Sequence, residues 1–71
     1  MMESIHVGFL LDPVPKLKAR AKVVMALLRR CGEPGMRIRG SIVRENGIDI
    51  FYQGKLKSGW TPQKIAEEAN R

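Results

Sequence analysis

The sequence predicts a small α+β domain, in which two helices accompany a three-stranded, mainly antiparallel sheet in the order β-α-β-β-α. Three patterns support this fold class. A short apolar segment ends at a proline, a longer segment repeats apolar residues at helical spacing, and an Asn-Gly pair separates two runs rich in β-branched residues. With 71 residues, of which 44% are hydrophobic, the chain is expected to form a single domain over residues 1–71.

Residues 4–11 are predicted to form the first strand, because they include β-branched and aromatic side chains and are too few for a stable helix. From residue 7 to residue 11 no side chain is polar. This pattern is typical of a strand buried on both faces, so we expect its second half to lie inside the core. His6, in the first half, is expected on the strand surface.

A helix is predicted from Asp12 to about Arg30, with Asp12 as its cap, Pro13 in its first turn and Gly32 at its end. One stripe of apolar side chains follows the helical period and should face the core. Its members are Leu17, Ala21, Val24, Leu28 and Cys31.

The same helix carries a basic flank formed by Lys18, Lys22 and Arg29, whereas Arg30 lies on the back of the helix. No acidic residue occurs between Pro13 and Gly32, so no pair within the helix neutralises this flank.

Residues 36–54 are predicted to form a β-hairpin with a type I′ turn at Asn46-Gly47. A two-residue loop there places Ile42 opposite Phe51. One face then carries Ile38, Ile42 and Phe51, and the other carries Val43, Ile48, Ile50 and Tyr52. One face should pack on the helices, and we expect the face with Ile50 and Tyr52 to be open to a partner.

The last helix is predicted to begin at Thr61-Pro62, with Thr61 as cap and with Trp60 and Ile65 as a hydrophobic staple. Residues 59–68, Gly-Trp-Thr-Pro-Gln-Lys-Ile-Ala-Glu-Glu, resemble the opening helix of helix-turn-helix domains in repressors and transposases. That resemblance implies DNA binding, but no recognition helix follows in this sequence, so no DNA-reading residue is assigned. An alternative makes residues 49–58 a helix that pairs with the last one.

Positive charge is concentrated in the middle of the chain. Residues 13–57 contain eleven Lys and Arg but three acidic side chains, a net charge of +8, which attracts polyanions. We therefore expect binding to nucleic acid, DNA or RNA, through basic side chains that neutralise phosphates and aromatic rings that stack on bases. The candidate residues are Lys18, Lys22, Arg29, Arg30, Arg37, Arg39, Tyr52, Lys55 and Lys57.

Catalysis is not expected, because the chain has one Cys, one His and no phosphate-binding loop. The same scarcity argues against a metal site, and no cofactor is expected. The lone cysteine fits a reducing compartment, and no apolar run is long enough to span a membrane, so we expect a cytoplasmic protein.

The competing hypothesis is a protein-interaction module that acts through the open hairpin face. Inhibitors, antitoxins and regulators encoded by phages or mobile elements are often small and basic, and the partner could also be a second copy of the chain. An open sheet face or edge strand can pair with another protein.

Overall fold

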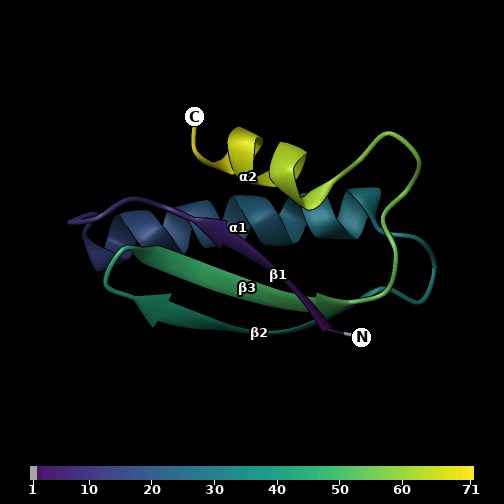
Figure 1. Ribbon diagram of the computed structural model, residues 1–71, viewed down its shortest axis with the longest axis horizontal. Coiled ribbons are helices and arrows are strands. Elements are labelled where there is room, and N and C mark those ends of the chain that lie inside the picture. Colours follow the sequence, from purple (N-terminus) through teal and green to yellow (C-terminus); the bar gives the residue numbers. More distant parts are fainter. Residues whose placement is uncertain (1) are drawn as a thin grey trace.

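The computed structural model describes residues 2–71 and confirms the α+β class and the predicted order of elements. Its elements are β1 (Met2–Val7), α1 (Val14–Cys31), β2 (Arg37–Arg44), β3 (Gly47–Gln53) and α2 (Pro62–Ala69). The three strands form one antiparallel sheet in the order β1-β3-β2, so the second hairpin strand is central. Both helices lie on the same side of the sheet, and α2 packs beside α1 (Figure 1).

The core fills the space between the sheet and the helices. The predicted apolar stripe of α1 is confirmed, because all five of its members are buried. Opposite them, the sheet contributes Ile5, Val7, Ile48, Ile50 and Tyr52, and α2 contributes Ile65 and Ala69. No helix within the described residues is long and apolar enough to cross a membrane.

The start of α2 is as predicted. The backbone N–H of Lys64 donates to Thr61 Oγ1 at 3.1 Å, and Pro62 occupies the first turn. Trp60 is half-buried against the core, and Ile65 is buried. Residues 47–53 form a strand, so the alternative that made residues 49–58 a helix is wrong.

The predicted burial of residues 9–11 is wrong. Strand β1 ends at Val7, and the side chains of Phe9, Leu10 and Leu11 are 53%, 60% and 88% exposed. The backbone turns out of the sheet at Gly8, where φ is +94°, in order to reach α1. This turn is closed by a hydrogen bond of 3.1 Å from the N–H of Asp12 to the carbonyl of Phe9.

Asp12 does not cap α1, contrary to the prediction. Pro13 occupies the cap position, where no side chain makes a capping hydrogen bond. Asp12 Oδ2 instead accepts a hydrogen bond from the N–H of Phe9 at 2.8 Å, within the loop. The Asp12 carboxylate therefore satisfies a backbone N–H of the loop, and the first N–H groups of α1 are left without a side-chain cap.

A buried arginine, which the sequence pattern did not reveal, joins this loop to both helices. Arg20 is 8% exposed, and its Nη1 donates to the carbonyl of Ala69 at 3.1 Å. Its Nε lies 3.3 Å from Asp12 Oδ2 as an ion pair without hydrogen-bond geometry. Its guanidinium carbon lies 5.2 Å from the centre of the Phe9 ring, within cation–π range.

The hairpin register also differs from the prediction. Glu45 and Asn46 occupy the turn, Arg44 pairs with Gly47, and Ile42 lies opposite Asp49 rather than Phe51. Neither turn residue has positive φ, so the turn is not type I′. The pairing is interrupted by an irregularity between Ile38 and Gly40.

Glycine is required at position 47 because another strand passes close to it. A Cβ built on Gly47 would lie 2.3 Å from the carbonyl oxygen of Val7, and φ at this residue is +144°. The Asn-Gly pair therefore predicts the position of the hairpin correctly. Gly47 is needed there, however, because it lets β1 pack closely on β3.

The face of the sheet that packs on the helices is the one predicted to be open. Ile50 and Tyr52 are 0% and 2% exposed, whereas Phe51 is half-buried and Ile42 is 48% exposed on the opposite face. Since the strands alternate side chains between faces, burying Tyr52 on the helix side leaves Phe51 on the uncovered side.

Candidate nucleic-acid interface

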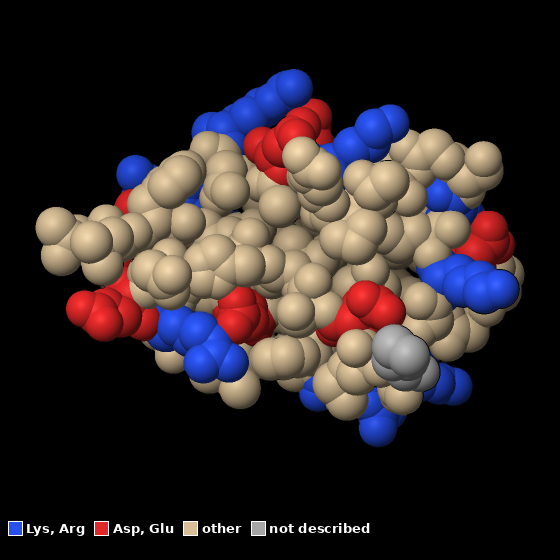
Figure 2. All heavy atoms as spheres, viewed as in Figure 1, with Lys and Arg blue, Asp and Glu red and all other residues tan. Residues whose placement is uncertain are grey.

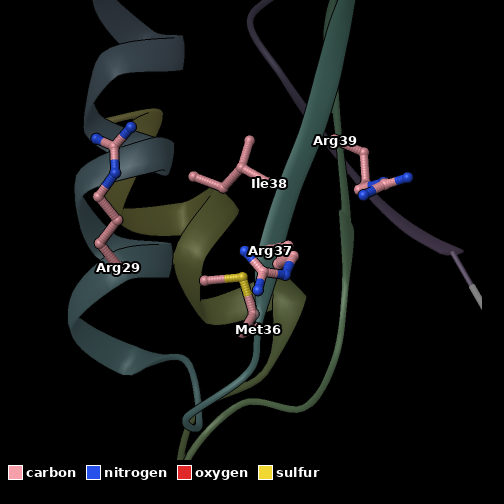
Figure 3. A pocket seen from close by; sticks show the side chains of 5 residues that line it. All are labelled: Arg29, Met36, Arg37, Ile38 and Arg39. Atoms are coloured by element: carbon pink, nitrogen blue, oxygen red, sulfur yellow. The ribbon is translucent and has the colours of Figure 1, made fainter.

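A shallow depression of about 450 Å³ lies between the last turns of α1 and the first half of β2. It is lined by Arg29, Met36, Arg37, Ile38 and Arg39 (Figure 3). Arg29 extends from α1 and Arg37 from β2 on either side of the gap, while Arg39 points away from α1. The structure thus brings together three of the predicted site residues.

The short connection after α1 positions these arginines. The helix ends at Cys31, and the N–H of Gly32 donates to the carbonyl of Leu28 at 2.8 Å. A second hydrogen bond, 3.0 Å from the N–H of Met36 to the carbonyl of Glu33, turns the chain into β2. Strand β2 therefore begins directly beside the helix end that carries Arg29.

Lys55 and Lys57 are held at the same end of α1. The N–H of Glu33 donates to the carbonyl of Lys55 at 2.8 Å, and the N–H of Lys57 donates to the carbonyl of Cys31 at 2.7 Å. Both lysine side chains are exposed. The linker before α2 therefore adds two cations beside the helix terminus that carries Arg29.

The arginines of the depression are free to bind an anion. All three are exposed, and none takes part in an ion pair among residues 2–71. A cation in the last turn of a helix also interacts favourably with the helix dipole, which gives Arg29 and Arg30 a structural role as well. That role leaves the charged groups accessible.

Lys18 and Lys22 lie about three and two turns before Arg29 on the same flank of α1, at helical spacing. Both are exposed, so they extend the row of cations along the helix. Arg30 is also exposed but does not line the depression. Arg30 therefore lies outside the group of predicted residues that line the depression.

The basic side chains do not cover the whole molecule. On the face shown in Figure 2, Lys and Arg lie among Asp and Glu and form no continuous basic surface. The depression and the flank of α1, rather than the net charge as such, are therefore the candidate interface.

Tyr52 has to be removed from the predicted site. Its side chain lies under the helices, and burial together with the negative charge of Glu3 raises the pKa of its hydroxyl. A ring in this position cannot stack on a nucleic-acid base. The error follows from the predicted hairpin face, which placed Tyr52 on the open side.

A second polar cluster lies on the uncovered face of the sheet. His6 Nδ1 lies 2.5 Å from Asp49 Oδ1, and Nε2 lies 3.1 Å from the carbonyl oxygen of Asn46. Arg44 Nε donates to the other oxygen of Asp49. Both neighbours of the His6 ring are hydrogen-bond acceptors. The cluster ties β1 to the hairpin.

We expect the Asp49 carboxylate to make stability depend on pH. Burial disfavours its charge, but the hydrogen bonds and charges of His6 and Arg44 outweigh burial and lower the pKa of Asp49 below its ordinary value of 3.8. Because the folded pKa is the lower one, its contribution is complete above about pH 4 and disappears as the pH falls through the folded pKa.

Asp49→Asn should therefore flatten the acid limb of a plot of unfolding free energy against pH, measured by urea denaturation. Glu45→Gln is the matched control, because Glu45 is exposed and forms no ion pair among the described residues. If both variants follow the parent curve below pH 4, the cluster does not contribute to acid sensitivity.

Comparison of the chain with protein-family models, curated proteins and solved structures gives no match. Within residues 2–71, no three His, Cys, Asp or Glu side chains are grouped so that they could hold a metal ion. Cys31 is buried on the core side of α1. The arginine depression and the surface around it are therefore the candidate functional site.

Proposed function

We propose that this protein binds nucleic acid, DNA or RNA, by contacting backbone phosphates at the depression between α1 and β2. The observation that carries the proposal is that Arg29 of α1 and Arg37 and Arg39 of β2 line one depression, and that none of them has a carboxylate partner among residues 2–71. The guanidinium group offers paired N–H donors that match phosphate oxygens, so three of them in one depression favour a phosphate ligand.

The surrounding cations support an extended ligand rather than a single small anion. Lys18 and Lys22 continue the basic row along α1, and Lys55 and Lys57 lie at its C-terminal end. A polymer with regularly spaced phosphates can contact all of these at once. With Tyr52 buried, no aromatic ring of the predicted site remains for stacking, so binding is expected to vary little with base sequence.

Binding should weaken with salt, because each neutralised phosphate releases condensed counterions. Arg29→Ala should reduce the slope of log K against log salt by about one unit, equally on unrelated sequences. Lys22→Ala should have a similar effect. The measurement is fluorescence anisotropy with labelled DNA and RNA oligonucleotides over a series of salt concentrations.

Arg30→Ala is the matched control, because it removes the same charge from the adjacent position but outside the depression. It should change the slope less than Arg29→Ala does. Equal effects of the two variants would mean that net charge, not the depression, determines binding. If the parent binds neither DNA nor RNA at low salt, the proposal is wrong.

The alternative, a protein-interaction module of the inhibitor, antitoxin or regulator type, loses its predicted surface. Ile50 and Tyr52 were its expected anchors, and both belong to the core. In either case we propose the cytoplasm as the compartment, since the single thiol, Cys31, is unpaired.

A further inference from the structure

Three consecutive apolar side chains protrude from one end of the molecule. Phe9, Leu10 and Leu11 are each more than half exposed, and Leu11, at 88%, is the most exposed of the large apolar residues. The loop between β1 and α1 forms this end of the molecule in Figure 1, and uncharged atoms project at the same place in Figure 2. Such a cluster is unusual on the surface of a monomeric protein.

The protruding loop is held in a defined shape. Asp12 accepts a hydrogen bond from the N–H of Phe9 and donates its own N–H back to the carbonyl of Phe9. The buried Arg20 lies against both the Asp12 carboxylate and the Phe9 ring. Leu11 is the one non-glycine residue within residues 2–71 with positive φ, +71°, which is unfavourable for a leucine. The loop therefore presents Leu11 outward at the expense of backbone strain.

A hollow that can receive such a side chain lies nearby on the same chain. It has a volume of about 240 Å³ and lies between the first half of α1 and the end of α2. Its lining residues are Lys16, Ala19, Arg20, Val23, Ala69 and Arg71. Two alanines and a valine that is 42% exposed form an apolar floor, and small side chains leave room for a branched one.

We propose that a second copy of this chain docks here, with Leu11 of each copy inserted into the α1–α2 hollow of the other. Leu11 lies five to twelve residues before the α1 residues that line the hollow, which run from Lys16 to Val23, and α1 begins three residues after Leu11, at Val14. Two α1 helices that cross antiparallel near Lys16 therefore bring both copies of Leu11 to both hollows. This is the reciprocal contact that a two-fold dimer requires.

The second copy is the favoured occupant because one chain carries both complementary features. The loop and the hollow lie toward the N-terminal half of α1, whereas the arginine depression lies at its C-terminal end. Dimerisation thus leaves Arg29, Arg37 and Arg39 accessible and places two depressions on one particle. The inference does not depend on nucleic-acid binding.

Sedimentation velocity over a wide concentration range tests the dimer. The parent should shift from the mass of one 8.0 kDa chain toward that of two as its concentration rises. Leu11→Gly should raise the dimer dissociation constant by at least about tenfold, because it removes the inserted side chain. The same variant should melt at the same or a higher temperature when monomeric, because glycine adopts positive φ without strain. Loss of dimer can then not be attributed to unfolding.

Two further variants locate the contact. Ala19→Glu should also prevent association, because it places a charge on the floor of the hollow. Ile42→Ala removes another exposed apolar side chain, which is 48% exposed on the uncovered sheet face, and should leave the dimer intact. A parent that stays monomeric at all concentrations overturns the proposal. So does a dimer that tolerates Ala19→Glu, or one that is lost with Ile42→Ala instead of Leu11→Gly.

Discussion

Leu28→Ala is expected to lower the free energy of unfolding by about 2–5 kcal/mol, because it removes three buried carbon atoms and leaves a cavity. Leu28 is 0% exposed and belongs to the apolar stripe of α1 that faces the core. A domain of this size has a small core and little stability to lose, about 3–5 kcal/mol in total. The variant should therefore be largely unfolded at room temperature.

Urea denaturation followed by circular dichroism and by the fluorescence of Trp60 measures this loss. Val23→Ala is the matched control on the same helix, since Val23 is 42% exposed and its truncation should change stability by less than about 0.5 kcal/mol at concentrations where the protein is monomeric. A Leu28→Ala protein that unfolds at the same urea concentration as the parent would show that α1 does not pack on the sheet as described.

Gly47→Ala should have an effect of similar size, about 2–5 kcal/mol, from two causes. The new methyl group would collide with the Val7 carbonyl oxygen at 2.3 Å and with the His6 ring, and alanine is strained at φ of +144°. The collision is with backbone, so it can be relieved only if β1 moves away from β3.

Gly35→Ala separates the two causes. Gly35 also has positive φ, +94°, but a Cβ there meets no atom within 4 Å. It should therefore show the strain alone, about 1–2 kcal/mol. Equal losses for the two variants, measured by thermal and urea denaturation, would contradict the close approach of β1 to the hairpin.

The predictions from sequence succeeded where a single periodic signal decides the outcome. The apolar stripe of α1, the stop at Gly32 and the cap at Thr61 each depend on a few neighbouring residues, and the structure agrees with all three. Local signals also identified the hairpin as such. They did not determine its register. Position 47 needs glycine because the backbone of Val7, which is distant in sequence, passes close to it.

The errors have a common physical origin in contacts between distant segments. The apolar run at residues 9–11 has the composition of a buried strand, but the chain must leave the sheet there to reach α1. Nothing in the sequence distinguishes Arg20 from the other basic residues of α1. Its burial depends on contacts with Ala69 and Phe9, which are distant from it in the sequence or lie outside the helix. For the candidate site, the sequence identified the cations, but only the packing of β2 beside α1 shows that Arg29 and Arg37 share a depression.

The position of β3 at the centre of the sheet has a consequence for the order of folding. Its partner β1 pairs Val7 with Ile48 and Met2 with Gln53, which are 41 and 51 residues apart, whereas β2 joins β3 through a two-residue turn. Closing the longer loop costs more entropy and is slower. The hairpin and α1 can therefore assemble first, and β1 can dock last. Until β1 docks, or whenever it detaches, the edge of β3 that β1 covers is free. A free strand edge is prone to pair with strands of other chains.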